Sequence, residues 1–383
     1  MNGKAYRILL LAAVLCMAGG IFLKKNYVEH ESAGTDNAAD HVDTDRIAAG
    51  GNAAEKNNLQ ESETGTGNSD EKLQTEESAT EDVQEEKDYI KWVDFNVSYE
   101  ALCAAYEADL ELHGQGKDAD WIDLLAVTAA RSGGNFGKTE VKNIRELALK
   151  LENKETTVEK ESSGLKYFNY YKEAYGAVLA EYVGDYEFLE SDESGNETER
   201  EGYGLKAFSP VAGGFAYSDY DDFGVSRSYG YNRPHLGHDM MGQTGTPIIA
   251  VESGMVECLG WNQYGGWRIG IRSFDQKRYY YYAHLRQNYP YAEGLKEGDT
   301  VSAGQVIGYM GHTGYSSKEN VNNIDETHLH FGIQLIFDES QKEGNNEIWI
   351  DCYALVRFLY RNRSPVQKVG ETREWISLRT LKQ

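Results

Sequence analysis

Cysteine is scarce in this sequence of 383 residues, which contains only four. Cys16 lies in an apolar run near the N-terminus, and Cys103, Cys258 and Cys352 are far apart in the chain. None has C-x-x-C spacing, so the cysteines predict neither a disulfide framework nor a thiolate metal site. We expect the last three to be small buried side chains.

Positive charge is also in short supply. Lys and Arg number 38 against 62 Asp and Glu, a formal net charge of −24. Nucleic acid is bound by basic residues that neutralise phosphates, so this balance argues against nucleic acid as a partner. Residues 26–90 alone hold 18 acidic residues against 4 basic ones, and residues 32–86 contain no aromatic side chain. Such a segment cannot bury enough apolar area to fold, and we expect a disordered acidic linker spanning about 40–50 Å.

Long hydrophobic runs are absent except for one, Ile8–Leu23, which has basic residues on both sides. We expect residues 1–25 to be an uncleaved, single-pass anchor in the cell membrane, with the rest of the chain outside the cytoplasm. A cleaved signal peptide leading to secretion is the second choice, because no small-x-small cleavage site follows the run. Lipidation of Cys16 is weaker still, since Leu15 stands where that signal requires a small residue.

Residues 91–190 show helical periodicity. Apolar residues recur at spacings of three and four, which predicts helices near 99–110, 121–128, 140–151 and 166–182. No group of chemically reactive residues occurs here, so we expect a small all-α domain whose role is to pack against or bind a protein partner. The polar, turn-rich stretch at 189–204 is the expected domain boundary.

Residues 205–365 have a different period. Short β-branched or aromatic runs alternate with Gly-containing turns, which predicts a mainly β domain. The remaining residues, 366–383, are expected to form a C-terminal tail. The predicted strands lie in "PIIAVESGMVECLG", "GWRIGIRSF", "RYYYYAHLR", "DTVSAGQVIGYMG" and "HLHFGIQLIF".

Five of the nine histidines fall within three short motifs of this β region. In "THLHFG", residues two apart point to the same face of a strand, so His328 and His330 should project side by side. A zinc ligand beside a proton-transfer group would explain the pair, although a chance pair on a solvated face explains the motif equally well when it is taken alone.

In "RPHLGHDMM", an extended backbone places His235, Gly237 and Asp239 on one face. The glycine leaves space between the other two, so His235 and Asp239 are the predicted metal ligands and His238 points away. With His330 they make a set of two histidines and one aspartate. Three protein ligands with one position open are typical of a catalytic zinc site.

These segments carry a family resemblance. "HLGHDMMGQTGTPIIAVESGMV", "YAHL", "GDTVSAGQVIGYMGHTG" and "HLHFG" resemble, in order and interval, the lysostaphin and LytM-type zinc metalloendopeptidases that cut peptide bonds in bacterial peptidoglycan. The resemblance covers roughly residues 208–338. It implies an antiparallel sheet of the duplicated hybrid motif or barrel-sandwich type with a groove across it. It also implies one Zn²⁺ per chain on His235, Asp239 and His330, with His284 and His328 as unliganded catalytic histidines.

Two features depart from the family pattern and bear on the shape of the groove. His238 stands where the family has an apolar residue, and the segment 315–327 is longer than usual. In "RYYYYAHL", strand alternation puts Tyr280 and Tyr282 on the face of His284, so they are the predicted substrate-binding tyrosines. Packing of all four tyrosines within the sheet is an equal alternative.

The predicted function is therefore a membrane-tethered zinc metalloendopeptidase, here assigned to residues 205–365, that hydrolyses peptidoglycan peptides. His328 would take a proton from water and pass it to the leaving amine, and His284 would donate to the oxyanion. The alternative is a catalytically silent wall-binding, scaffold or activator protein of the same fold. Such proteins usually lack a site residue, and this chain has all five.

Overall fold

The computed structural model describes residues 89–192, 194–228, 232–342 and 346–383. The expected membrane segment at Ile8–Leu23 and nearly all of the expected linker at 26–90 lie outside these residues. Within the described part of the chain, no helix is both long and apolar enough to cross a membrane.

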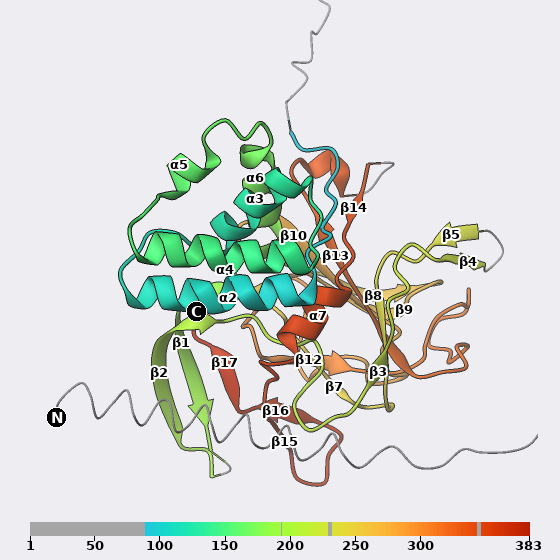
Figure 1. The fold of residues 1–383 in the computed structure, drawn as a ribbon. Coiled ribbons are helices and arrows are strands. Elements are labelled where there is room, and N and C mark those ends of the chain that lie inside the picture. The colour runs from blue at the N-terminus through green and yellow to red at the C-terminus, as the bar shows by residue number, and fades with distance from the viewer. Residues whose placement is uncertain (1–88, 193, 229–231, 343–345) are drawn as a thin grey trace, which may run out of the picture. The chain divides into compact units, whose positions relative to one another are not determined.

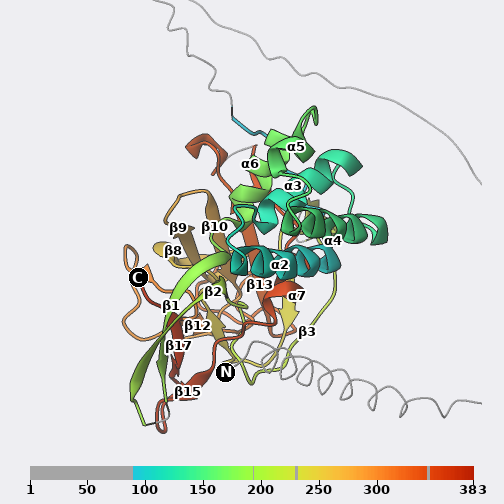
Figure 2. The same ribbon diagram turned by 60° about the vertical axis from the view of Figure 1, so that its left-hand side comes forward.

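The helical region begins at residue 99 and ends at residue 179, and the four predicted helices are present. The helices are α2 (Tyr99–Gly114), α3 (Trp121–Ser132), α4 (Lys138–Glu152), α5 (Val158–Ser162) and α6 (Phe168–Leu179). Asp120 starts α3 because its side chain accepts a hydrogen bond from the Asp123 amide at 2.8 Å. The five helices form one group in both views (Figures 1 and 2).

An antiparallel β region follows, as predicted. Its main sheet has the order β11-β8-β9-β10-β13-β6-β3, with β14 paired to β13, and β7 pairs with β12 beside it. The strands are β3 (Ser218–Asp219), β4 (Ser226–Ser228), β5 (Asn232–Pro234), β6 (His238–Met241), β7 (Pro247–Ile249), β8 (Gly254–Asn262), β9 (Gly266–Ser273), β10 (Arg278–Ala283), β11 (Thr300–Val301), β12 (Val306–Tyr309), β13 (His328–Leu335) and β14 (Ile348–Trp349). A 3₁₀ turn (Glu339–Gln341) and helix α7 (Tyr353–Leu359) complete this region.

The expected boundary at 189–204 and the expected tail at 366–383 both form ordered strands. Residues 183–205 make a hairpin of β1 (Val183–Ser191) and β2 (Glu197–Leu205), and β17 (Arg379–Leu381) pairs with β1. Strands β15 (Val366–Lys368) and β16 (Trp375–Ser377) pair with each other. The sequence hides the hairpin because β2 is exposed and polar along most of its length, so it lacks a hydrophobic alternation.

The helices pack directly on the sheet. Arg278 of β10 is fully buried, and its guanidinium donates to the Ala177 carbonyl of α6 at 2.6 Å and to Glu252 at 2.8 Å. The Tyr203 hydroxyl of β2 donates to Asp109 of α2 at 2.6 Å. The described helices and strands therefore belong to one compact unit.

The three cysteines in the described part of the chain are unpaired. Cys352 is buried, as predicted, and its burial raises the pKa of the thiol. Cys103 and Cys258 are partly exposed, so the prediction of three buried side chains is wrong for these two.

Candidate active site

A groove with a volume of about 710 Å³ runs over strands β9, β10 and β13. Cavities of this size are typical of ligand sites. The five residues predicted as ligands or catalytic groups all line it: His235, Asp239, His284, His328 and His330.

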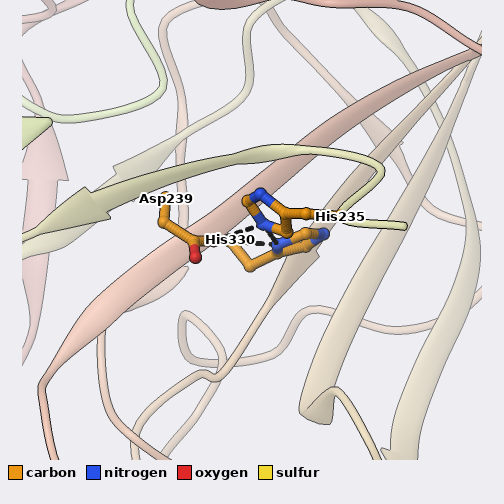
Figure 3. A group of neighbouring side chains, drawn as sticks. All are labelled: His235, Asp239 and His330. Atoms are coloured by element: carbon orange, nitrogen blue, oxygen red, sulfur yellow. Dashed lines mark hydrogen bonds and ion pairs between the residues drawn. The ribbon is translucent and has the colours of Figure 1, made fainter. Parts of the chain in front are cut away.

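Three of these side chains converge on one point (Figure 3). Nε2 of His235 lies 3.0 Å from Nδ1 of His330 and 3.1 Å from Oδ1 of Asp239, and the last two atoms are 2.9 Å apart. The ligand atoms of a tetrahedral zinc ion with bonds of about 2.0–2.1 Å would be separated by about 3.3–3.4 Å. The two imidazoles and one carboxylate thus fit zinc in both donor type and spacing.

The sheet register explains this convergence. β13 pairs with β6 so that His330 stands directly opposite Asp239. His235 reaches the same point from the segment between β5 and β6, where Gly237 forms a bend. A Cβ atom on Gly237 would lie 2.5 Å from the His330 ring, so only glycine leaves room for that imidazole. The predicted gap beside Gly237 is real, and the His330 ring fills it.

His238 points to the other side of β6, as strand alternation predicts. It is buried, its Nε2 lies 2.8 Å from Oδ2 of Asp219, and its ring packs against Tyr353. It contributes no atom to the group of three ligands. Its role is to pair with Asp219 behind the site.

Replacing His238 with isoleucine should leave zinc binding at one ion per chain. The free energy of unfolding should fall by about 1–3 kcal/mol, because Asp219 loses its hydrogen-bond partner. Metal analysis of the purified variant and a denaturant titration measure the two effects. Loss of zinc would show that His238 is a ligand.

Two residues outside the ligand set, Asp222 and Arg227, support the metal ligands, and the sequence did not reveal them. Nδ1 of His235 lies 3.1 Å from Oδ1 of Asp222 and 3.4 Å from the Asp222 carbonyl. Arg227 donates to Asp222 and, at 3.2 Å, to Oδ2 of Asp239. Partners of this kind orient metal ligands and fix the histidine tautomer. Asp222 therefore directs Nε2 of His235 towards the metal position.

Replacing Asp222 with asparagine is expected to weaken zinc binding by about 10- to 100-fold, because His235 loses a charged partner. Competition with a chelator of known affinity measures the change. Asp221→Asn is the matched control, since Asp221 is adjacent and exposed and does not contact His235. Equal affinities in the two variants would contradict the assigned role.

The protonation states of Asp239 and His330 favour metal binding, and that of His235 opposes it. Burial opposes ionisation of Asp239, but hydrogen bonds from His235 and His330 hold the pKa of its carboxyl well below the usual range. Burial lowers the pKa of His330, so its ring is neutral at neutral pH. Burial also acts to lower the pKa of His235, but the hydrogen bond and charge of Asp239 outweigh it and raise this pKa. A carboxylate and neutral imidazoles are the forms that bind metals, so a metal has to displace a proton from His235 but not from Asp239 or His330.

His284 and His328 stand next to each other beside the ligands, with ring centroids 4.7 Å apart. Nδ1 of His284 lies 2.9 Å from the Thr313 carbonyl, and Nδ1 of His328 lies 2.9 Å from the Glu326 carbonyl. Because a carbonyl only accepts, each Nδ1 carries the proton when its ring is neutral. Each ring therefore presents the lone pair of Nε2.

The structure corrects the prediction that Tyr280 and Tyr282 bind the substrate. Tyr280 and Tyr282 are fully buried, and the groove is lined by Tyr279 and Tyr281. Strand alternation is interrupted at His284, because its φ of 61° turns the side chain to the other face of the strand. This left-handed residue directs His284 to the face of Tyr281, and Tyr280 and Tyr282 pack in the core.

The long segment 315–327 forms one wall of the groove, to which it contributes Tyr315 and Ile324. Asn320 fixes it in place, because its Oδ1 accepts from the Trp267 indole and from the Asn288 amide, each at 2.9 Å. This departure from the family pattern thus shapes the groove without adding a metal ligand.

Comparison with known proteins gives the following matches. Residues 233–345 match Peptidase family M23. An L-Ala--D-Glu endopeptidase of Bacillus subtilis (strain 168) is 35% identical over 147 residues, which are 38% of this chain and 43% of that protein. The lysostaphin of Staphylococcus staphylolyticus is 39% identical over 98 residues, 25% of this chain and 18% of that protein. This chain thus spans less than half the length of either relative.

Among solved structures, the catalytic domain of lysostaphin from Staphylococcus simulans is 31% identical. The match covers 37% of this chain and 92% of that chain, with a TM-score of 0.29.

Proposed function

We propose that the protein is a zinc endopeptidase that hydrolyses peptide bonds in peptidoglycan, because residues 233–345 match peptidase family M23 and because His235, Asp239 and His330 form a group that can hold a metal ion. The observation that carries the proposal is the complete site. Three ligand atoms and two unliganded imidazoles meet in one groove. The similar proteins from Bacillus and Staphylococcus include an endopeptidase for an L-Ala--D-Glu bond, which supports a peptide substrate.

Zinc would act here as a Lewis acid on the scissile carbonyl and would lower the pKa of a nearby water molecule. The side chains of the protein accept the proton of this water and pass it on. Nε2 of His284 or of His328 can accept it, because the Nδ1 proton of each ring is held by a backbone carbonyl. The protonated ring then becomes a donor to the leaving amine.

The walls of the groove position the substrate. Tyr281 lies beside the ligand His330, with ring centroids 5.9 Å apart, and Tyr315 stands 5.9 Å from the His284 ring. Aromatic side chains on both sides of the site can hold an extended peptide across it. Holding the scissile bond in register with the imidazoles lowers the entropic part of the barrier.

We further propose that the enzyme is tethered to the cell membrane by residues 1–25 and acts on the wall side. The support is the apolar run at Ile8–Leu23 and the acidic segment 26–90 that follows it. The full chain should sediment with membranes, and a chain starting at residue 26 should not. Recovery of the full chain in the soluble fraction would refute the tether.

The experiment that tests the activity is digestion of defined muropeptides, with the products identified by mass. The wild-type protein should release peptide fragments, chelation should stop the release and added zinc should restore it. A folded, zinc-loaded protein that cleaves no muropeptide would refute the proposal and favour a silent wall-binding protein.

A further inference from the structure

Two arginines in the groove lack an acidic partner. Arg268 of β9 lines the groove, and its Nε is buried without a hydrogen-bond partner. It forms no ion pair with a carboxylate in the described part of the chain, and its strongest charge interactions there are with Tyr281, Cys258 and Tyr279. Arginine is seldom buried without a charged partner, and Arg268 is partly buried.

Arg233 stands on the same groove, two residues before the ligand His235. Its guanidinium donates to the Tyr315 hydroxyl at 2.7 Å and lies over the rings of Tyr264 and Tyr315, 5.2 and 5.5 Å from their centroids. These contacts hold the arginine in place but do not neutralise it, and no described carboxylate forms an ion pair with it.

The two arginines act on one point beside the metal ligands. Burial raises the pKa of the Tyr281 phenol, while the charges of Arg268 and Arg233 both act to lower it. Tyr281 lines the groove together with both arginines, and its ring packs against the ligand His330. A positive region therefore surrounds the Tyr281 hydroxyl, next to the place where the bond is cut.

The other cations of the groove differ in this respect. Arg227 pairs with Asp222 and Asp239, and Lys342 pairs with Glu257. The chain as a whole carries a net charge of −24. Among the described residues of the groove, positive charge without an ion pair is thus confined to Arg233 and Arg268.

We infer that Arg233, Arg268 and the Tyr281 hydroxyl form a subsite for a carboxylate of the substrate. The inference rests on the proposed endopeptidase function and names its substrate class. The preferred peptide carries a free carboxylate near the scissile bond, because the Tyr281 ring lies only 5.9 Å from the ring of the ligand His330. An acidic stem peptide has such a group, and a cross-bridge made only of glycine does not. Guanidinium groups bind carboxylates through charge-assisted hydrogen bonds.

The test uses two muropeptides that differ in one group, a free carboxylate near the cleaved bond or the corresponding carboxamide. With the zinc-loaded wild-type protein, kcat/KM for the carboxylate peptide should exceed that for the carboxamide by about tenfold or more. Arg268→Gln should bring the two values within about threefold of each other, mainly by lowering kcat/KM for the carboxylate peptide. Arg233→Gln should act in the same direction.

Arg200→Gln is the matched control, because Arg200 lies on the exposed hairpin strand β2 and its loss changes the net charge equally. The Arg200→Gln variant should prefer the carboxylate peptide over the carboxamide peptide by the same factor as wild type. Equal cleavage of both peptides by wild type would overturn the subsite, and this comparison needs no variant. A preference that survives in both groove variants would overturn the assignment to these residues. Cleavage of neither peptide would instead refute the endopeptidase function.

Discussion

Replacing His330 with alanine is expected to abolish zinc binding and to lower kcat/KM by about 10³-fold or more. His330 supplies one of three ligand atoms that lie within about 3 Å of one another. Two remaining ligands leave the ion weakly held, and the lost Lewis acid contributes several kcal/mol to transition-state stabilisation. Metal analysis and hydrolysis of a defined muropeptide measure the two effects together.

The control for this variant is His238→Ile, which also removes an imidazole from the paired strands β6 and β13. His238 faces Asp219 behind the sheet, so this variant should keep both zinc and activity. If His330→Ala retained stoichiometric zinc, the ligand set proposed here would be wrong.

The second large effect is expected for His328→Ala. This variant should keep zinc, because Nε2 of His328 is 3.9 Å from Asp239 and contributes no ligand atom. Its kcat should fall by about 10²- to 10⁴-fold, the usual contribution of a positioned general acid or base. Steady-state kinetics with zinc in excess separates this loss from a loss of metal.

His113→Ala serves as the comparison for His328→Ala. His113 is an exposed histidine on α2 that stacks on Tyr203, with no contact to the groove. It should keep wild-type kcat and zinc content. If His328→Ala lost zinc together with activity, His328 would be a ligand rather than a proton carrier.

Much of the site could be predicted because it depends on short-range geometry. Strand alternation puts His328 and His330 on one face with Leu329 and Phe331 in the core, and the structure has this arrangement. The same rule separates His238 from Asp239. Local sequence was sufficient here because each of these residues lies in a regular strand.

The tyrosines of β10 show a position at which strand alternation predicts the wrong face. Alternation assumes an unbroken strand, but β10 ends at Ala283 and the positive φ of His284 changes the direction of its side chain. Nothing in "YYYYAHL" marks this residue as left-handed. The prediction therefore placed Tyr280 and Tyr282 in the groove, where the structure has Tyr281.

Long-range contacts were the other part that the sequence did not reveal. Asp222 and Arg227 support the ligands from a segment that has no motif of its own, and they are recognised only from their distances to His235 and Asp239. Strand β17 pairs with β1, although almost the whole β region lies between them in the sequence. Pairing at such separation depends on the complete fold, and single-sequence patterns carry no information about it.

Titration of zinc into the metal-free protein, with binding and muropeptide hydrolysis followed in the same samples, shows whether peptide cleavage depends on zinc at His235, Asp239 and His330. We expect one zinc ion per chain and a rate of hydrolysis that rises in proportion to zinc occupancy until the site is full. Full occupancy without hydrolysis, or hydrolysis that does not depend on zinc, would contradict this expectation.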